Sequence, residues 1–181
     1  METVQPIRNE SQIAEMKKAL LYYGSKRDEF LFTLGINCGL RISDMLKLKK
    51  KDIKDYKLKL KESKTNKLFE LPLDHKYKEI SEYIQFLDDE DYLFKSKKSD
   101  NPISRVQAHR ILKKASESIG LKDISNHSMR KTFGYFHYKR TKDIATLMML
   151  FNHSSQGITL RYIGVHQEEL SKSFSASFGG L

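Results

Sequence analysis

Apolar residues recur at helical spacing along most of the chain. The first such pattern covers residues 10–23, where Ile13, Met16 and Leu20 share one face. Asn9 can cap the first turn, because an asparagine side chain accepts a hydrogen bond from a backbone N–H that has no partner within the helix. The pattern therefore predicts an amphipathic helix that packs its apolar face inward.

Further helical patterns follow along the chain. Ser25 and Asp28 have the spacing of a capping box, which predicts a buried helix from there to about Gly39. A short helix is expected after Arg41, with Ser43 as its cap. The remaining predicted helices cover about residues 75–87, 103–119, 128–140, 143–151 and 155–163, and an amphipathic tail helix covers 167–174.

One segment alternates with the period of a strand instead. Residues 56–61 place apolar side chains on one face and lysines on the other. Residues 68–73 can form the return strand, with a basic hairpin tip at 63–67, and residues 92–94 are a candidate for a further short strand. The predicted class is mostly α with a small antiparallel β-sheet, an α+β arrangement.

Composition and charge narrow the functional classes. A chain of 181 residues with 39% apolar and 31% charged residues is typical of one soluble globular domain. The formal net charge of +10 favours a polyanionic partner. Cys38 is the single cysteine and lies in an apolar run, which indicates a buried side chain in a reducing, cytoplasmic protein. We expect no membrane association, because no apolar stretch approaches the ~20 residues that cross a bilayer.

A scattered set of polar residues has the chemistry needed to cleave a phosphodiester without a metal or other cofactor. Arg41 and Arg130 can neutralise phosphate oxygens, because a guanidinium binds them through two parallel hydrogen bonds. Tyr162 can attack phosphorus and form a covalent intermediate. No carboxylate set for Mg²⁺ and no Cys/His spacing for zinc is evident.

Three more residues can handle protons and hydrogen bonds in that reaction. His127 precedes Arg130 by three residues, on about the same helical face, and can assist proton transfer from the tyrosine. Lys64, in the hairpin tip, can protonate the departing 5′-oxygen, and His153 can donate a hydrogen bond to the phosphate. Each residue taken singly is more often structural, so the hypothesis depends on the whole set.

These residues stand in segments that resemble the motifs of the tyrosine recombinase (phage integrase) family. Gly39-Leu40-Arg41-Ile42-Ser43 resembles its first arginine box, and Ser63-Lys64-Thr65-Asn66-Lys67 resembles its hairpin lysine motif. His127-Ser128-Met129-Arg130 resembles its H-x-x-R box, and His153 with Tyr162 resembles the terminal histidine-and-tyrosine box. Asn152 departs from this pattern, since a glycine is usual before the histidine.

The resemblance implies the fold of the family's catalytic domain and a DNA strand transferase that acts through a 3′-phosphotyrosyl intermediate. It implies double-stranded DNA as substrate, tetramers on paired DNA sites, a monomer when free, and a bacterial or phage-borne origin. Residues 1–181 would be one catalytic domain, with a core at about 10–165 and a tail at 166–181 that is exchanged between subunits. The core-binding domain that usually precedes the first arginine box would be absent.

Candidate DNA contacts and two other functions complete the hypotheses from sequence. The cations expected to contact phosphates are Lys57, Lys59, Lys61, Lys67, Lys95, Lys97, Lys98, Lys131 and Arg161. The main alternative is an accessory protein that binds DNA without cleaving it and modulates a full-length recombinase. A weaker one is a general RNA- or nucleoid-binding protein, although no RNA-binding motif is evident.

Overall fold

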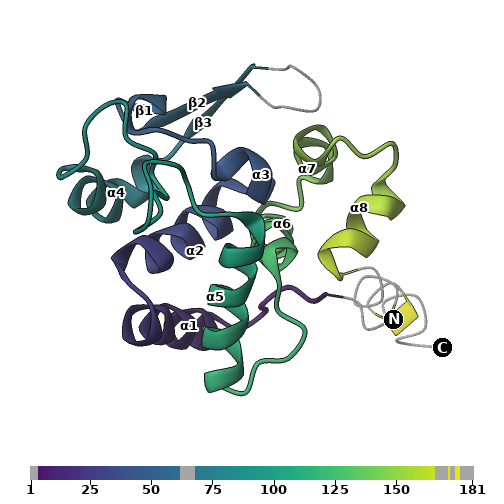
Figure 1. Ribbon diagram of the computed structural model, residues 1–181. Helices are drawn as coiled ribbons and strands as arrows, with labels where there is room; N and C mark the ends of the chain where they lie inside the picture. Colours follow the sequence, from purple (N-terminus) through teal and green to yellow (C-terminus); the bar gives the residue numbers. More distant parts are fainter. Residues whose placement is uncertain (1–3, 62–67, 166–170, 172–173, 176–181) are drawn as a thin grey trace.

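The computed structural model describes residues 4–61, 68–165, 171 and 174–175 (Figure 1). It confirms the predicted class, since helices predominate beside one three-stranded antiparallel sheet of order β1-β2-β3. The main helices are α1 (Glu10–Tyr23), α2 (Lys26–Cys38), α3 (Ile42–Met45), α4 (Tyr77–Ile84), α5 (Arg105–Ser118), α6 (Asn126–Thr141), α7 (Ile144–Phe151) and α8 (Gln156–Ile163). Short 3₁₀ turns lie at Lys50–Asp52 and Asp74–Lys76.

Helix α2 is the centre of the molecule, in contact with α1, α4, α5 and α6 (Figure 1). Its apolar run from Phe30 to Leu34 is buried throughout, which explains why the sequence shows no polar face there. Gly35 lets α6 approach closely, because a Cβ at that position would lie 2.6 Å from Sδ of Met129. The close packing of α2 on α6 brings the C-terminal end of α2 next to α6.

The sheet lies beside α3 and α4 and is built from β1 (Ile53–Lys54), β2 (Lys57–Lys61) and β3 (Leu68–Pro72) (Figure 1). Leu58 of β2 pairs with Leu71 of β3 and is fully buried. The predicted hairpin is confirmed, and β1 is an added strand too short for periodicity to reveal. The candidate strand at 92–94 is wrong, since Tyr92 forms only an isolated bridge to Lys49.

Two predicted helix caps are also wrong. Ser25 does stand at the N-cap of α2, but its side chain makes no capping bond there. Asp28 instead accepts hydrogen bonds from Nε and Nη2 of Arg27. Arg41, and not Ser43, is the N-cap residue of α3. The hairpin tip and most of the predicted tail helix lie outside the described residues.

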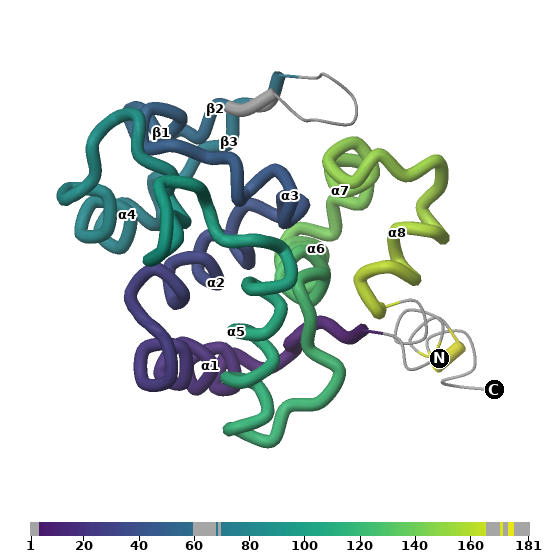
Figure 2. The backbone as a smooth tube through the Cα atoms, viewed as in Figure 1, coloured from purple at the N-terminus to yellow at the C-terminus, as the bar shows by residue number. Residues whose placement is uncertain are grey.

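The C-terminal third of the chain packs around α6. Helices α7 and α8 pack on each other and on α6, and bury Leu147, Phe151, Ile163 and Val165 (Figure 2). Gly134 permits this packing, because a Cβ there would lie 2.6 Å from Cγ2 of Ile163. Across the described ranges, every helix is too short or too polar to span a bilayer.

Candidate active site

Gly39 and Arg41 form the turn between α2 and α3. Gly39 ends α2 in the left-handed region, at φ +62°, where glycine is favoured. A Cβ at Gly39 would lie 2.4 Å from the ring of Phe133, so the close approach of α6 also requires glycine. Arg41 follows in an extended conformation, half-buried, at the start of α3.

Arg130 is buried and its guanidinium is held from two sides. Nη1 donates to the carbonyl of Gly39 at 2.6 Å, and Nη2 donates to the carbonyl of Leu150 at 3.2 Å. The guanidinium carbon lies 4.5 Å from the centre of the Phe151 ring. Burial lowers the Arg130 pKa to about 10, so the group remains a cation at neutral pH. Two backbone carbonyls therefore fix this cation at the junction of α2, α6 and α7.

Tyr162 lies in α8 beside this cation. Its half-buried ring meets the ring of His153 edge-on, with centroids 5.1 Å apart, and Nζ of Lys131 lies 5.3 Å from its centre. Burial raises the pKa of the Tyr162 phenol, and the charges of Arg130 and Arg41 oppose that rise. The phenol is therefore protonated at neutral pH and lies close to the guanidinium.

His153 follows a left-handed residue at the end of α7. Asn152 occupies the C-cap position at φ +56°, a conformation that asparagine tolerates better than most other side chains. This explains how asparagine can stand where the family usually has glycine. Burial, then the charges of Arg130 and Arg41, lower the pKa of the His153 imidazole, which favours its neutral form.

The hydroxyl of Thr159 is a hydrogen-bond partner of His153. Oγ1 of Thr159 lies 3.1 Å from Nδ1 of His153 and 3.2 Å from the carbonyl oxygen of Ser155. A hydroxyl has one proton, so it donates to one of these two groups at a time. When it donates to Ser155, it accepts from Nδ1–H of His153, and Nε2 of the neutral ring then carries the lone pair.

His127 stands at the N-terminus of α6. The capping box of Ser125 and Ser128 begins this helix, and the His127 backbone N–H donates to Oγ of Ser125. Its side chain is exposed, yet partial burial, followed by the charges of Lys131 and Arg130, lowers the imidazole pKa. His127 is therefore neutral at pH 7 and open to solvent, close to the buried cation.

The structure thus brings Arg41, Arg130, His153 and Tyr162 together, with His127 at their edge. Lys64 lies outside the described residues. Asp44 was not selected from the sequence, although it is a buried carboxylate one helical turn after Arg41. Its charge acts on Arg130, and its Oδ1 is buried without a hydrogen-bond partner among the described residues. The sequence did contain a signal for Asp44, namely a charged residue within the apolar stretch that follows Arg41.

The candidate DNA-contact residues are in different environments. Lys57 and Lys59 share Glu70, at 2.9 and 3.3 Å, and Lys95 bridges Asp91 and Asp100, at 3.4 and 2.8 Å. Lys131 donates to the carbonyl of Val4 at 2.7 Å. The side chains of Lys97, Lys98 and Arg161 are exposed, while those of Lys61 and Lys67 lie outside the description.

Comparisons with known proteins agree with this geometry. Residues 8–169 match the model of the "Phage integrase family". A "Probable integrase/recombinase YoeC" from Bacillus subtilis (strain 168) is 49% identical over 184 residues, covering 100% of both chains. Five other curated relatives match over 44% to 58% of their own length, so the chain spans about half of each.

Two solved structures share the fold at low identity. The XerA recombinase has a TM-score of 0.76 at 17% identity, covering 98% of this chain and 66% of that one. A lambda integrase dimer bound to a COC′ core site has a TM-score of 0.70 at 18% identity, covering 90% of this chain and 49% of that one. On the family match over most of its length, this chain belongs to the phage integrase family, as a tyrosine recombinase domain.

Proposed function

We propose that this protein cleaves and rejoins double-stranded DNA in site-specific recombination, with Tyr162 as nucleophile. The observation that carries the proposal is that Tyr162 and the buried Arg130 cation pack against the same ring, that of Phe151, with the Tyr162 ring centre at 5.3 Å and the guanidinium carbon at 4.5 Å from its centre. A phosphate that reached this phenol would also meet Arg130, and Arg41 lies near enough to influence both groups. Preorganised cations of this kind stabilise the charge that develops on the non-bridging oxygens.

The reaction exchanges one phosphoester for another. Oη of Tyr162 would bond to phosphorus as the bond between phosphorus and the 5′-oxygen breaks, which leaves a 3′-phosphotyrosyl link and a 5′-hydroxyl. The phenol proton must leave during attack, because the phenol is protonated at neutral pH. His127, neutral and solvent-accessible, is the proposed acceptor, and Lys64 is the proposed donor to the 5′-oxygen.

The role of His153 depends on its protonation. With Nδ1–H directed to Thr159, neutral His153 has only an acceptor at Nε2. It can donate to a phosphate oxygen only as an imidazolium. An arriving phosphate opposes the effect of the two arginines, which favours that form. We therefore propose that His153 is neutral in the free protein and becomes a donor when DNA binds.

The proposed partners are double-stranded DNA and further recombinase subunits in the cytoplasm. Lambda integrase, which shares the fold, has been solved as a dimer bound to a core site and as a tetramer bound to a Holliday junction. We propose the same kind of assembly here, with a monomer when free and with the tail at 166–181 exchanged between subunits. We propose that residues 1–181 form one catalytic domain.

A suicide-substrate trap tests the proposal. Nicked duplexes of pooled random sequence are incubated with the protein, and adducts that survive denaturation are separated by electrophoresis. Wild-type protein should form the adduct, and Tyr162→Phe should form none while it binds DNA normally. Tyr22→Phe is the matched control, because Tyr22 is 82% exposed and remote in sequence from the site. Normal binding without an adduct in wild-type protein would favour the accessory function.

A further inference from the structure

The N-terminal segment, residues 4–8, runs from α1 beneath α6 towards the end of α8 (Figure 2). It precedes the first helix, and its sequence shows no periodic pattern. Even so, Pro6 and Ile7 are buried, and Ile7 is only 1% exposed. A short extended segment of this kind stays in place only where its backbone finds hydrogen-bond partners.

Those partners come from α6 and from the loop before it. The Ile7 N–H donates to Oγ1 of Thr132 at 2.9 Å, and both groups are buried. The Gln5 N–H donates to the carbonyl of Asp123 at 3.3 Å. The Val4 carbonyl accepts from Nζ of Lys131 at 2.7 Å. The segment is therefore attached along the N-terminal half of the helix that carries Arg130.

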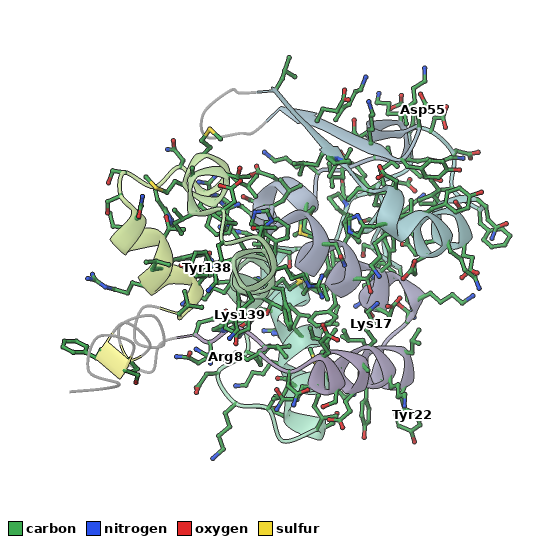
Figure 3. All side chains as sticks on the ribbon, turned by 180° about the vertical axis from the view of Figure 1, so that it is seen from behind. Arg8, Lys17, Tyr22, Asp55, Tyr138 and Lys139 are labelled. Atoms are coloured by element: carbon green, nitrogen blue, oxygen red, sulfur yellow. The ribbon has the colours of Figure 1, made fainter. Side chains whose placement is uncertain are left out.

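Arg8 extends this attachment to the helix that carries Tyr162. Nη2 of Arg8 donates to the carbonyl of Gly164 at 3.2 Å and to Oε1 of Gln5 at 3.1 Å. Gly164 is the left-handed C-cap of α8, two residues after Tyr162. Arg8 also lies over the ring of Tyr135, 5.7 Å from its centre, and Nζ of Lys139 lies 5.4 Å from the same centre; Figure 3 labels Arg8 and Lys139.

Space at this contact is limited. A Cβ at Gly164 would lie 2.7 Å from Nη2 of Arg8 and 3.4 Å from Cγ of Pro6. Arg8 and Pro6 therefore pack closely on Gly164, and a shift of the end of α8 away from the segment would break the hydrogen bond of Arg8. The segment thus opposes movement of α8 away from it.

A second contact reaches the tyrosine itself. Lys131, held by the Val4 carbonyl, places its ammonium 5.3 Å from the centre of the Tyr162 ring. A cation over an aromatic face is attracted to it, more strongly where both are partly desolvated. Burial, followed by the charge of Arg8, lowers the pKa of Lys131, so the Arg8 guanidinium lies close enough to act on this ammonium.

We infer that Arg8 is a positioning residue for the nucleophile: with residues 4–7 and Lys131, it holds the C-terminal end of α8 so that Tyr162 stays against Arg130. The inference concerns α8 in the free protein, and its consequence for DNA cleavage rests on the proposed function. It assigns Arg8 no contact with DNA. Misplacement of a reacting group by about 1 Å can lower a rate by roughly a hundredfold, so loss of one such contact has a measurable effect.

The test compares Arg8→Ala with Arg140→Ala in the full chain. Arg140 is a matched control, because it pairs with Glu10 at 3.0 Å and lies over the ring of Phe136 in α6, so its contacts among the described residues do not involve α8. Hydrogen exchange of the amides at 161–165 should be roughly tenfold faster in Arg8→Ala and unchanged in Arg140→Ala. Unchanged exchange in Arg8→Ala would overturn the inference.

Kinetics on DNA separate positioning from binding. In single-turnover reactions on the nicked duplex, Arg8→Ala should form the adduct roughly tenfold more slowly. Its dissociation constant for DNA should stay within about twofold of wild type, since Arg8 does not bind DNA in this proposal. Arg8→Lys can keep one of the two hydrogen bonds, so its rate of adduct formation should lie between those of wild type and Arg8→Ala. A slower rate that is explained entirely by weaker binding would overturn the inference.

The two proposals fail in different ways. If wild-type protein forms no adduct, the proposed function fails, and the exchange experiment still decides whether Arg8 holds α8. If wild-type protein forms the adduct and Arg8→Ala forms it at the wild-type rate, the positioning role is wrong while the proposed function stands.

Discussion

The hydroxyl of Thr159 lies 3.1 Å from Nδ1 of His153, six residues earlier, and forms a hydrogen bond with this ring nitrogen. Thr159 is fully buried in the helix that also carries Tyr162. One side chain of α8 therefore orients the imidazole, while another supplies the proposed nucleophile. The protonation state of His153 and the position of Tyr162 are coupled through a single helix.

Thr159→Val should remove the hydrogen bond to His153 with little change in side-chain volume. His153 would lose its acceptor, so both tautomers should appear in nitrogen NMR spectra of the imidazole, where wild type shows Nδ1–H alone. Loss of a buried hydrogen bond should lower the free energy of unfolding by about 1–3 kcal/mol. Adduct formation should slow roughly tenfold. A wild-type NMR spectrum would mean that Thr159 does not select the tautomer.

Arg130→Lys should be far more damaging than its conservative appearance implies. A lysine keeps the charge but cannot donate to the Gly39 and Leu150 carbonyls and to a phosphate at the same time. Adduct formation should fall by roughly a hundredfold or more. Arg161→Lys is the control, because Arg161 is exposed and a lysine there keeps the charge. Equal rates for the two variants would argue against the assigned role of Arg130.

Acid should destabilise and inactivate the protein through His127 and His153, while the arginines stay charged. The folded pKa values of His127 and His153 are lowered, so the folded protein resists protonation of both rings. In the unfolded chain a histidine titrates near about 6.5. Their contribution to stability is therefore constant above that pH and is lost as the pH falls from there towards the folded values.

Two measurements check this sign. The free energy of unfolding, measured by urea titration, should decline as the pH falls below about 6.5, and His127→Gln should flatten part of that decline. The rate of adduct formation should also decline as the pH falls, because a protonated His127 cannot accept the phenol proton. A rate that rises in acid would exclude His127 as the acceptor.

Cys38 should be inert in the folded protein. It is 2% exposed, and burial raises its pKa to about 12, so almost no thiolate forms at neutral pH. A chromogenic disulfide reagent should react with no thiol in native protein and with one thiol per chain in urea. Fast reaction of native protein would show that α2 opens readily near the Arg130 site.

Two glycines of the C-terminal helices should respond in opposite ways to alanine. At Gly134 the new methyl would meet Ile163 and Phe151, at 2.6 and 2.9 Å, and destabilise the protein by about 1–3 kcal/mol. At Gly157 nothing lies within 4 Å, and alanine should stabilise α8 by up to about 1 kcal/mol. Thermal unfolding of both variants measures this, and similar shifts would contradict the packing of α8 on α6.

The sequence by itself determined the helices, the hairpin and the family. Those features follow from local signals, such as apolar spacing, caps and short motifs, which act over a few residues. The bounds of α1 agree with the prediction at both ends, and α2, α5, α6 and α8 agree within about two residues. The set of Arg41, His127, Arg130, His153 and Tyr162 was also recognisable, because each stands at a fixed place in its motif.

Only the tertiary structure decided how these residues are held. Arg130 donates to a carbonyl 91 positions away, and Arg8 to one 156 positions away. The burial of Asp44 beside the arginines likewise depends on which elements pack together, and so does the hydrogen bond from Lys131 to the Val4 carbonyl. Spacing along the chain carries no information about such contacts, because a hydrogen bond depends on distance in space. The candidate residues were therefore recognisable in the sequence, and the contacts that position Tyr162, the proposed nucleophile, were not.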